Sequence, residues 1–124
     1  FVLPLGMTIN MNGTAIMQVV ATLFVAGCAG YDVTFGQLVV VALLVLIASV
    51  GTPAAPGAGA IILFTILSGL GYVNDSALLA YSLILAINRP IEMLLTALNV
   101  VGDSAASIYV AKSEGMLDET KYNA

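Results

Sequence analysis

The segment SVGTPAAPGAG, residues 49–59, constrains the fold of this chain more than any other feature. Apolar runs flank it at 38–48 and 60–67, and each is too short for a full membrane crossing, which takes about 20 apolar residues. The prolines and glycines between them cannot continue a helix, so backbone N–H and C=O groups are left unpaired. Inside a membrane such a backbone is tolerated only where protein buries it or where it lines a polar cavity. We therefore expect a re-entrant helical hairpin over residues 36–71, with its tip at a binding site.

The composition is that of an integral membrane protein. Of 124 residues, 60% are hydrophobic and 8% are charged, whereas about a quarter are charged in a typical soluble domain. The sequence has no histidine and a single cysteine, which excludes a zinc or copper cluster and an internal disulfide. With a formal charge of −4 it offers no basic patch for nucleic acid. Because residues 1–4 contain neither an initiator methionine nor a cationic segment, we expect the chain to be part of a longer protein.

A broken helix is expected in the apolar segment 5–28, which the cluster NMNGT at residues 10–14 interrupts. In one interpretation these side chains only hydrogen-bond to neighbouring helices, which contributes about 1 kcal/mol each. In the other, the helix unwinds there, and its carbonyl and side-chain oxygens coordinate a cation, as in discontinuous transporter helices. Five clustered residues exceed what helix packing needs, and this favours the unwound segment.

Local signals mark where the remaining helices begin and bend. Thr34 is a suitable N-cap for the first hairpin arm, and Asp75 or Ser76 for the last helix, residues 76–111. Pro90 removes one helical hydrogen bond and disfavours α backbone at the preceding residue, so we expect a kink there.

The segment 112–124 is polar, and we expect it to be a flexible tail. Lys112 and Lys121 follow directly after the last apolar segment. Because lysine and arginine are enriched on the cytoplasmic side of membrane proteins, the tail is expected to be cytoplasmic.

Polar residues recur every three or four positions along the last helix, within about 100° of arc: Asn88, Glu92, Thr96, Asn99, Asp103 and Ser107. A carboxylate that faces lipid costs several kcal/mol, so this stripe must face the interior of the helix bundle. In one interpretation Glu92 pairs with Arg89, and Asp103 is solvated near the membrane surface. In the other, the two acids face a binding partner, and Asp103 with Asn99 supplies the oxygen ligands that suit a hard cation such as Na⁺.

The order of three motifs, NMNGT, SVGTPAAPGAG and NVVGD, resembles the glutamate transporter-like family of dicarboxylate and amino acid:cation symporters. Nearly the whole chain is similar to that family's seventh helix, second re-entrant hairpin and eighth helix. The resemblance implies an all-α membrane protein with a discontinuous transmembrane helix, a re-entrant hairpin whose tip gates the substrate site, and a long kinked transmembrane helix. It also implies that residues 1–111 form part of a transport domain, within a full-length homotrimer in the cell membrane.

The resemblance assigns roles to individual positions. One sodium site would be formed by the backbone carbonyls of Gly6, Asn10 and Asn99 and the carboxylate of Asp103. A second would be formed by the carbonyls of Thr8, Ser49, Val50 and Thr52, and a third by the side chains of Asn10 and Asn12. The residues that match substrate contacts are Thr14, Val50, Ala55, Gly59, Glu92, Leu95, Thr96 and Asn99. Of these, Glu92 would take the amino group of a substrate, and Asn99 its α-carboxylate.

The sequence departs from the common family pattern at four of these aligned positions. Asn12 stands where an aspartate is usual, so the third cation site should be weakened or lost. Leu95 replaces the arginine that pairs with an acidic substrate side chain, and leucine cannot form that bidentate bond. Glu92 replaces an aspartate, and Asn88 replaces another acid. These changes favour a neutral amino acid over aspartate or glutamate, unless Arg89 supplies the missing positive charge.

We therefore expect a secondary symporter, not an enzyme, that couples a Na⁺ gradient, or alternatively H⁺, to the uptake of a small amino acid or dicarboxylate. Its other contacts are membrane lipids, and nucleic acid is not a partner. Two alternatives remain open. One is a channel-like or purely structural membrane subunit, and the other is an intramembrane enzyme that uses Glu92 and Asp103. The enzyme is disfavoured because no nucleophile with a base partner accompanies these acids.

Overall fold

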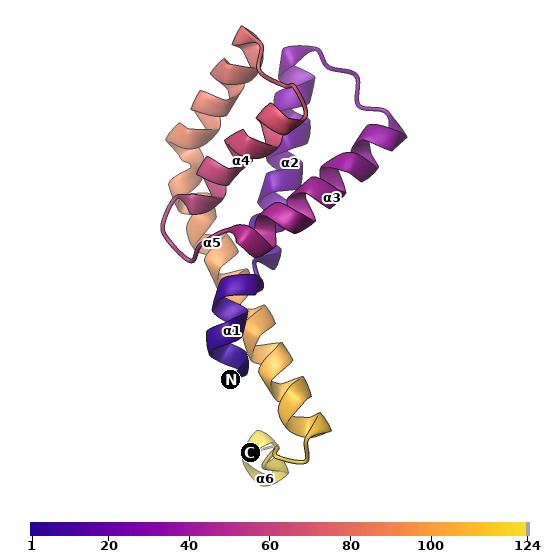
Figure 1. The fold of residues 1–124 in the computed structure, drawn as a ribbon. Helices are drawn as coiled ribbons and strands as arrows, with labels where there is room; N and C mark the ends of the chain where they lie inside the picture. The colour runs from indigo at the N-terminus through magenta and orange to yellow at the C-terminus, as the bar shows by residue number, and fades with distance from the viewer. Residues whose placement is uncertain (124) are drawn as a thin grey trace.

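The computed structural model describes residues 1–123, and in that range it is entirely helical, with no strand (Figure 1). This confirms the expected all-α fold class. The helices in chain order are α1 (Val2–Ile9), α2 (Asn12–Ala29), α3 (Phe35–Gly51), α4 (Ala58–Gly69), α5 (Asp75–Ser113) and α6 (Glu119–Tyr122).

The first apolar segment is broken where the asparagine-rich cluster predicted it. Helix α1 ends at Ile9, and Asn10 has extended backbone with φ −96° and ψ 92°. Helix α2 then begins at Asn12. The side chains of Asn10 and Asn12 both hydrogen-bond outside the regular helical pattern, which stabilises the interruption.

Helices α3 and α4 form the expected hairpin. Thr34 caps α3 in a capping box, because its hydroxyl accepts from the backbone N–H of Gln37 and the Gln37 side chain accepts from the N–H of Thr34. The non-helical tip is shorter than the expected 49–59 and comprises only residues 52–57. The last turn of α3 continues to Gly51, and Gly57 starts α4 from a left-handed conformation with φ +84°, which glycine adopts without strain.

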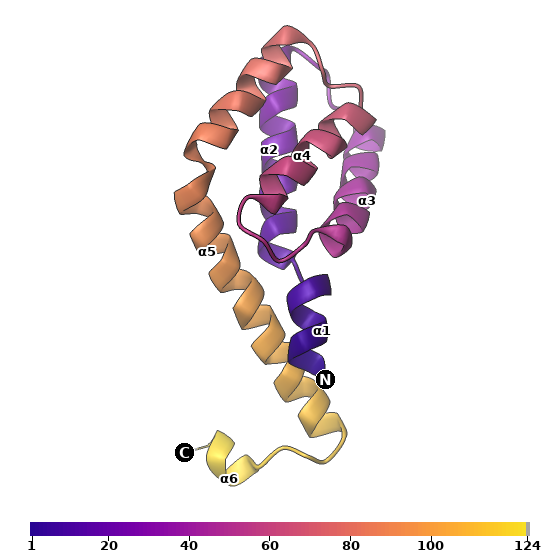
Figure 2. The same cartoon turned by 60° about the vertical axis from the view of Figure 1, so that its left-hand side comes forward.

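Helix α5 is a single long helix with Pro90 in its interior, and Figure 2 shows that it bends between its upper and lower halves. A bend is the expected effect of an internal proline. Asn74 is the N-cap, in place of the expected Asp75 or Ser76, because its side chain accepts from the backbone N–H of Ala77 at 2.8 Å.

Helix α2 is the central packing element and contacts α3, α4 and α5. Its apolar face and those of α4 and α5 form the main buried cluster, which includes Met17, Val25, Leu63 and Leu67. The hairpin tip, the α1–α2 break and the middle of α5 lie at one level of the molecule, as both ribbon views show. Three irregular or bent segments therefore meet at one place.

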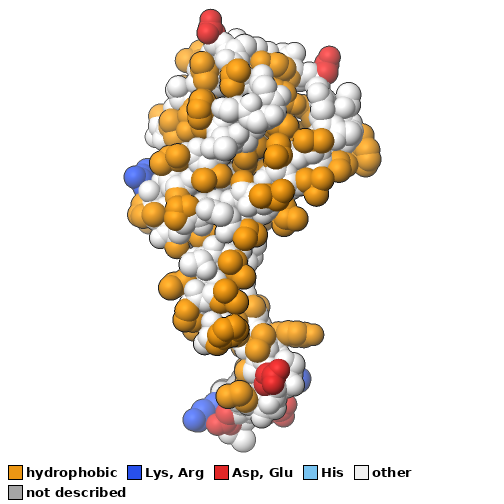
Figure 3. Space-filling model, viewed as in Figure 1, with side chains coloured by type: hydrophobic (Ala, Val, Ile, Leu, Met, Phe, Trp, Pro, Cys, Tyr) orange, Lys and Arg blue, Asp and Glu red, His pale blue; other side chains and the backbone are white. Residues whose placement is uncertain are grey.

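Much of the outer surface is apolar. Figure 3 shows hydrophobic side chains over the middle of the molecule, while most charged side chains lie near its two ends. The segments Val2–Ala29 and Asp75–Ser113 are long and apolar enough to cross a membrane, and α3 and α4 are shorter apolar helices. This pattern matches an integral membrane protein whose half-length hairpin packs against full-length segments.

Candidate functional site

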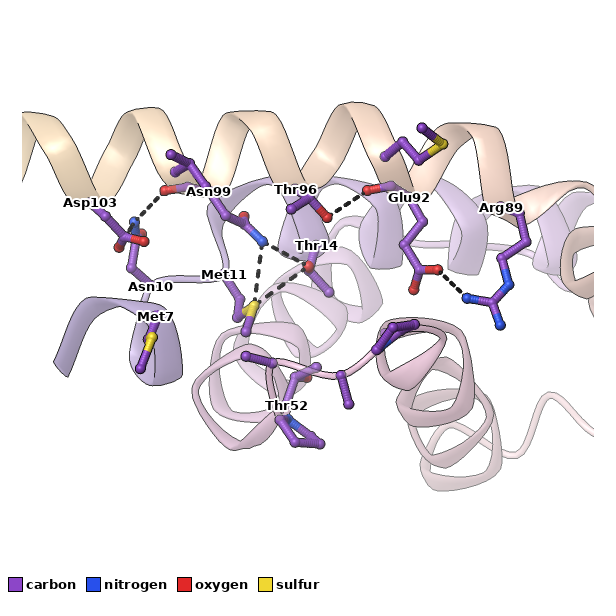
Figure 4. A pocket seen from close by; sticks show the side chains of 17 residues that line it. Met7, Asn10, Met11, Thr14, Thr52, Arg89, Glu92, Thr96, Asn99 and Asp103 are labelled. Atoms are coloured by element: carbon purple, nitrogen blue, oxygen red, sulfur yellow. Dashed lines mark hydrogen bonds and ion pairs between the residues drawn. The ribbon is translucent and has the colours of Figure 1, made fainter. Parts of the chain in front are cut away.

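A pocket of about 530 Å³ lies where the helix break, the hairpin tip and α5 meet. Most of the predicted site residues line it (Figure 4): Asn10, Thr14, Thr52, Ala55, Gly59, Glu92, Thr96, Asn99 and Asp103. The polar stripe of α5 supplies one wall, and Pro53 and Pro56 of the tip lie opposite. The structure thus brings together residues that are up to 93 positions apart in sequence.

At one end of the pocket, oxygen atoms cluster around Asp103. The Asp103 side chain is buried, and its Oδ1 accepts a hydrogen bond of 2.8 Å from Asn10 Nδ2. The same amide donates to the backbone carbonyl of Asn99 at 3.2 Å. Gly6 is also close, because a Cβ on Gly6 would lie 2.5 Å from Asp103 Oδ1. The four residues predicted to form the first sodium site therefore lie close together.

The chemistry of this cluster fits a hard cation. A carboxylate and backbone carbonyls are the oxygen ligands that such cations prefer. The amide of Asn10 donates to two oxygen atoms of this cluster, Asp103 Oδ1 and the backbone carbonyl of Asn99. The carbonyl of Gly6 accepts from the backbone N–H of Asn10 at 2.7 Å, which keeps the end of α1 beside the break.

The side chain of Asn99 joins α5 to the broken helix. Its Oδ1 accepts from the backbone N–H of Gly13 at 2.8 Å. Its Nδ2 donates to Thr14 Oγ1 and to Met11 Sδ, each at 3.4 Å. Gly13 permits this approach, since a Cβ there would lie 2.5 Å from the Leu95 carbonyl oxygen. Asn99 thus shares with Asn12 the backbone donor that the break leaves outside the helical pattern.

At the other end of the pocket, Glu92 contacts the hairpin tip. Its Oε1 accepts from the backbone N–H of Gly57 at 2.7 Å, and its Oε2 forms an ion pair with Arg89 Nη1 at 3.2 Å. The Arg89–Glu92 pairing considered from sequence is therefore present. The accompanying idea that Asp103 is solvated is wrong, because only 7% of that residue is exposed.

The residues of the second predicted sodium site are less clearly assembled. Ser49 and Thr52 are buried near the tip and Val50 is exposed, and helix α1 contacts α3. The hydroxyls of Thr8, Ser49 and Thr52 each donate to a carbonyl three or four residues earlier in the chain. Among residues 1–123, no side-chain hydrogen bond joins Thr8 to the hairpin.

Asn12 and Leu95 lie outside the pocket lining. Asn12 Oδ1 accepts from the backbone N–H of Gly13 at 2.9 Å, and its amide lies beside Gly102. Leu95 is buried in the main apolar cluster with Met17. The position at which the family carries an arginine therefore faces the core between α2 and α5.

Several pocket or tip contacts were not predicted from sequence. Met7, Met11 and Met93 line the pocket. They could not be predicted as site residues, because a methionine within an apolar sequence does not stand out from core residues. Gln18 is fully buried and donates to the carbonyl of Gly59 at 3.3 Å. A glutamine inside an apolar run, one turn after Thr14, was a usable signal for a polar contact within the bundle.

Comparisons with known proteins identify the family of this chain. The model of the sodium:dicarboxylate symporter family matches residues 1–113. The chain is 39% identical over 120 residues to an excitatory amino acid transporter of Onchocerca volvulus, covering 95% of this chain and 23% of that protein. It is 40% identical over 117 residues to excitatory amino acid transporter 2 of Homo sapiens, covering 92% and 20%.

The chain spans about a fifth of the length of these curated relatives. The family match covers the helix break, the hairpin and the polar stripe of α5, which are the three parts that build the pocket. This chain belongs to the sodium:dicarboxylate symporter family.

Proposed function

We propose that this chain supplies the substrate and cation sites of a secondary active symporter, which uses a Na⁺ gradient to take up a small amino acid or dicarboxylate. The observation that carries the proposal is the pocket in which a buried carboxylate, a helix break and a hairpin tip meet. The names of the relatives, excitatory amino acid transporters, support an amino acid as substrate. The tip at residues 52–57 is the gate over that substrate.

The first Na⁺ is held by Asp103, the carbonyls of Gly6, Asn10 and Asn99, and the end of α1. Support comes from the short contacts among these residues. The set Thr8, Ser49, Val50 and Thr52 is the second cation site, supported by the contact between α1 and α3.

The third cation site, at Asn10 and Asn12, is weak or lost. Asn12 is a neutral amide whose oxygen already accepts from Gly13. Membership of the sodium:dicarboxylate symporter family supports Na⁺ as the coupling ion, and H⁺ is the alternative.

The substrate lies between Thr14, Glu92, Thr96 and Asn99 on one side and the tip on the other. We propose a neutral amino acid rather than aspartate or glutamate. The pocket lining carries one cationic group, Arg89, and two acidic groups, Glu92 and Asp103, a formal sum of −1. Leu95 adds no positive charge, and Arg89 is paired with Glu92.

Residues 1–111 are part of the transport domain, and residues 112–124 are a cytoplasmic tail. The apolar outer surface is the face for lipid and for the rest of the transport domain. A homotrimeric full-length protein is proposed on the family resemblance alone. Chemical cross-linking of the intact protein in membranes tests the trimer.

The test is uptake of labelled amino acids by the intact protein in proteoliposomes, with and without an inward Na⁺ gradient. Saturable, Na⁺-dependent uptake of a neutral amino acid is expected, and Asp103→Asn abolishes it. Uptake of aspartate would mean that Arg89 supplies a positive charge to the substrate. Flux that does not saturate and ignores the Na⁺ gradient would favour the channel-like alternative.

A further inference from the structure

The start of helix α4 is tied to neighbouring helices by three side chains. Glu92 accepts from the Gly57 N–H at 2.7 Å, Gln18 donates to the Gly59 carbonyl at 3.3 Å, and the Tyr81 hydroxyl donates to the carbonyl of residue 60 at 3.0 Å. The ties come from α5, α2 and α5, respectively. Besides the apolar packing of the two arms on α2, these side-chain hydrogen bonds attach the hairpin to the bundle where the tip enters α4.

The tip segment before Gly57 is held differently. Its hydrogen bonds in the described chain stay within the hairpin. Thr52 N–H donates to the Ser49 carbonyl, Thr52 Oγ1 to the carbonyl of residue 48, and Ala55 N–H to the Pro53 carbonyl, while the Ala55 carbonyl accepts from the first N–H of α4. Among the side-chain hydrogen bonds from the bundle to the hairpin in the described chain, the Glu92–Gly57 bond thus lies nearest to the tip. Its strength decides how firmly the tip is closed on α5.

Arg89 is placed to control this bond. It lies one turn before Glu92 on α5 and pairs with Oε2, the carboxylate oxygen that Gly57 does not use. The guanidinium also lies over the tip, since a Cβ on Gly57 would be 3.9 Å from Arg89 Nη2. The Arg89 side chain is 68% exposed and that of Glu92 is 19% exposed. The pair thus holds a semi-buried carboxylate in one orientation.

We propose that Arg89 is a positioning residue that fixes Glu92 on the Gly57 N–H, and that this Arg89–Glu92–Gly57 contact latches the hairpin tip closed. A hydrogen bond to a charged acceptor is about twice as strong as a neutral one, and a carboxylate held at both oxygens cannot rotate away. The latch depends on the proposed function only in treating the hairpin as a gate. Its existence can be tested without any transport measurement.

Amide hydrogen exchange in the intact protein, in lipid nanodiscs without Na⁺ or substrate, tests the latch. Because Pro53 and Pro56 carry no amide hydrogen, exchange in the tip reports on few sites, and overlapping peptides isolate Gly57. Arg89→Gln is expected to speed exchange at Gly57 about tenfold, and Glu92→Ala to remove its protection. Arg89→Lys, which retains a cation, is expected to restore protection to within about threefold of the wild type.

Lys112→Gln is the matched control, because it removes one positive charge from the last turn of the same helix, far from the tip. It is expected to leave Gly57 exchange unchanged. Unchanged exchange at Gly57 in Arg89→Gln and Glu92→Ala would overturn the latch. Equal acceleration throughout α3 and α4 would overturn it as well, since the variants would then loosen the whole hairpin. Normal latch behaviour without Na⁺-driven uptake would refute the proposed function alone.

Discussion

Substituting Gly6 by alanine tests the cation cluster with the smallest change available. A Cβ on Gly6 would lie 2.5 Å from Asp103 Oδ1, whereas ordinary contacts begin at 3.4 Å. The carboxylate must therefore move by about 0.9 Å, the difference between these two distances. That movement breaks the 2.8 Å hydrogen bond from Asn10 Nδ2. The substitution thus displaces the one charged ligand of the proposed Na⁺ site.

The expected loss follows from the ligand that is displaced. A contact to a charged group contributes about 1.5–3 kcal/mol. Because the displaced Asp103 oxygen is the charged ligand of the proposed Na⁺ site, Na⁺ binding weakens by a similar amount, about 10- to 100-fold in the dissociation constant at 1.4 kcal/mol per tenfold. Helix propensity acts in the opposite direction, since alanine is favoured over glycine by up to about 1 kcal/mol inside a helix.

The measurement is equilibrium binding of radioactive sodium to the purified intact protein. Gly27→Ala is the control, because Gly27 lies in α2 and a Cβ there has nothing within 4 Å. The control is expected to bind Na⁺ as the wild type does. If Gly6→Ala binds Na⁺ within about twofold of the wild type, the site does not use Asp103 as described.

Three further predictions concern the same pocket and the tail. Asn99→Ala removes both the Asn99 Oδ1 acceptor of the Gly13 N–H and the Nδ2 contact to Thr14, so substrate affinity by calorimetry should fall about tenfold or more. Ser104→Ala, whose hydroxyl bonds only to the Val100 carbonyl of its own helix, should leave it unchanged. Asn12→Asp restores a carboxylate beside Asn10 and should steepen the Na⁺ dependence of uptake, whereas an unchanged Hill coefficient would argue against a cation site there. The Thr120 hydroxyl, which donates to Asp118, holds the pKa of that carboxyl below its usual value of 3.8. A lowered carboxyl pKa stabilises the fold above the unfolded value, and this effect is lost as pH falls through the folded pKa. The α6 amide signals in NMR should therefore titrate with a midpoint below pH 3.8.

Local features of this fold were predictable because they depend on residues close together in sequence. The break at Asn10, the capping box at Thr34 and the bend of the proline-containing helix each follow from backbone hydrogen bonding within a few residues. The polar stripe of α5 also followed from helical periodicity alone. It identified Asp103 and Asn99 as inward-facing residues, and both face the break.

Tertiary contacts explain what sequence reasoning could not resolve. The tip is shorter than expected because α3 continues through Ser49 to Gly51. A glycine near the end of a helix does not by itself determine at which residue the helix ends. The hydrogen bond between Glu92 and Gly57 joins residues 35 positions apart, and no local pattern encodes it. Leu95 lies in the same sector of α5 as the polar stripe, but it packs in the apolar cluster with Met17 of α2. A helix face about 100° wide is broad enough to border the core on one side and the pocket on the other.

The central claim is that one pocket binds cation and substrate together, with Asn99 contacting both. The most direct test measures the substrate dissociation constant at several Na⁺ concentrations, and the Na⁺ dissociation constant with and without substrate. Linkage requires the two ligands to strengthen each other by the same factor. The account predicts equal factors of about tenfold or more in the wild type, both lost in Asp103→Asn. Substrate binding that is independent of Na⁺ would contradict it.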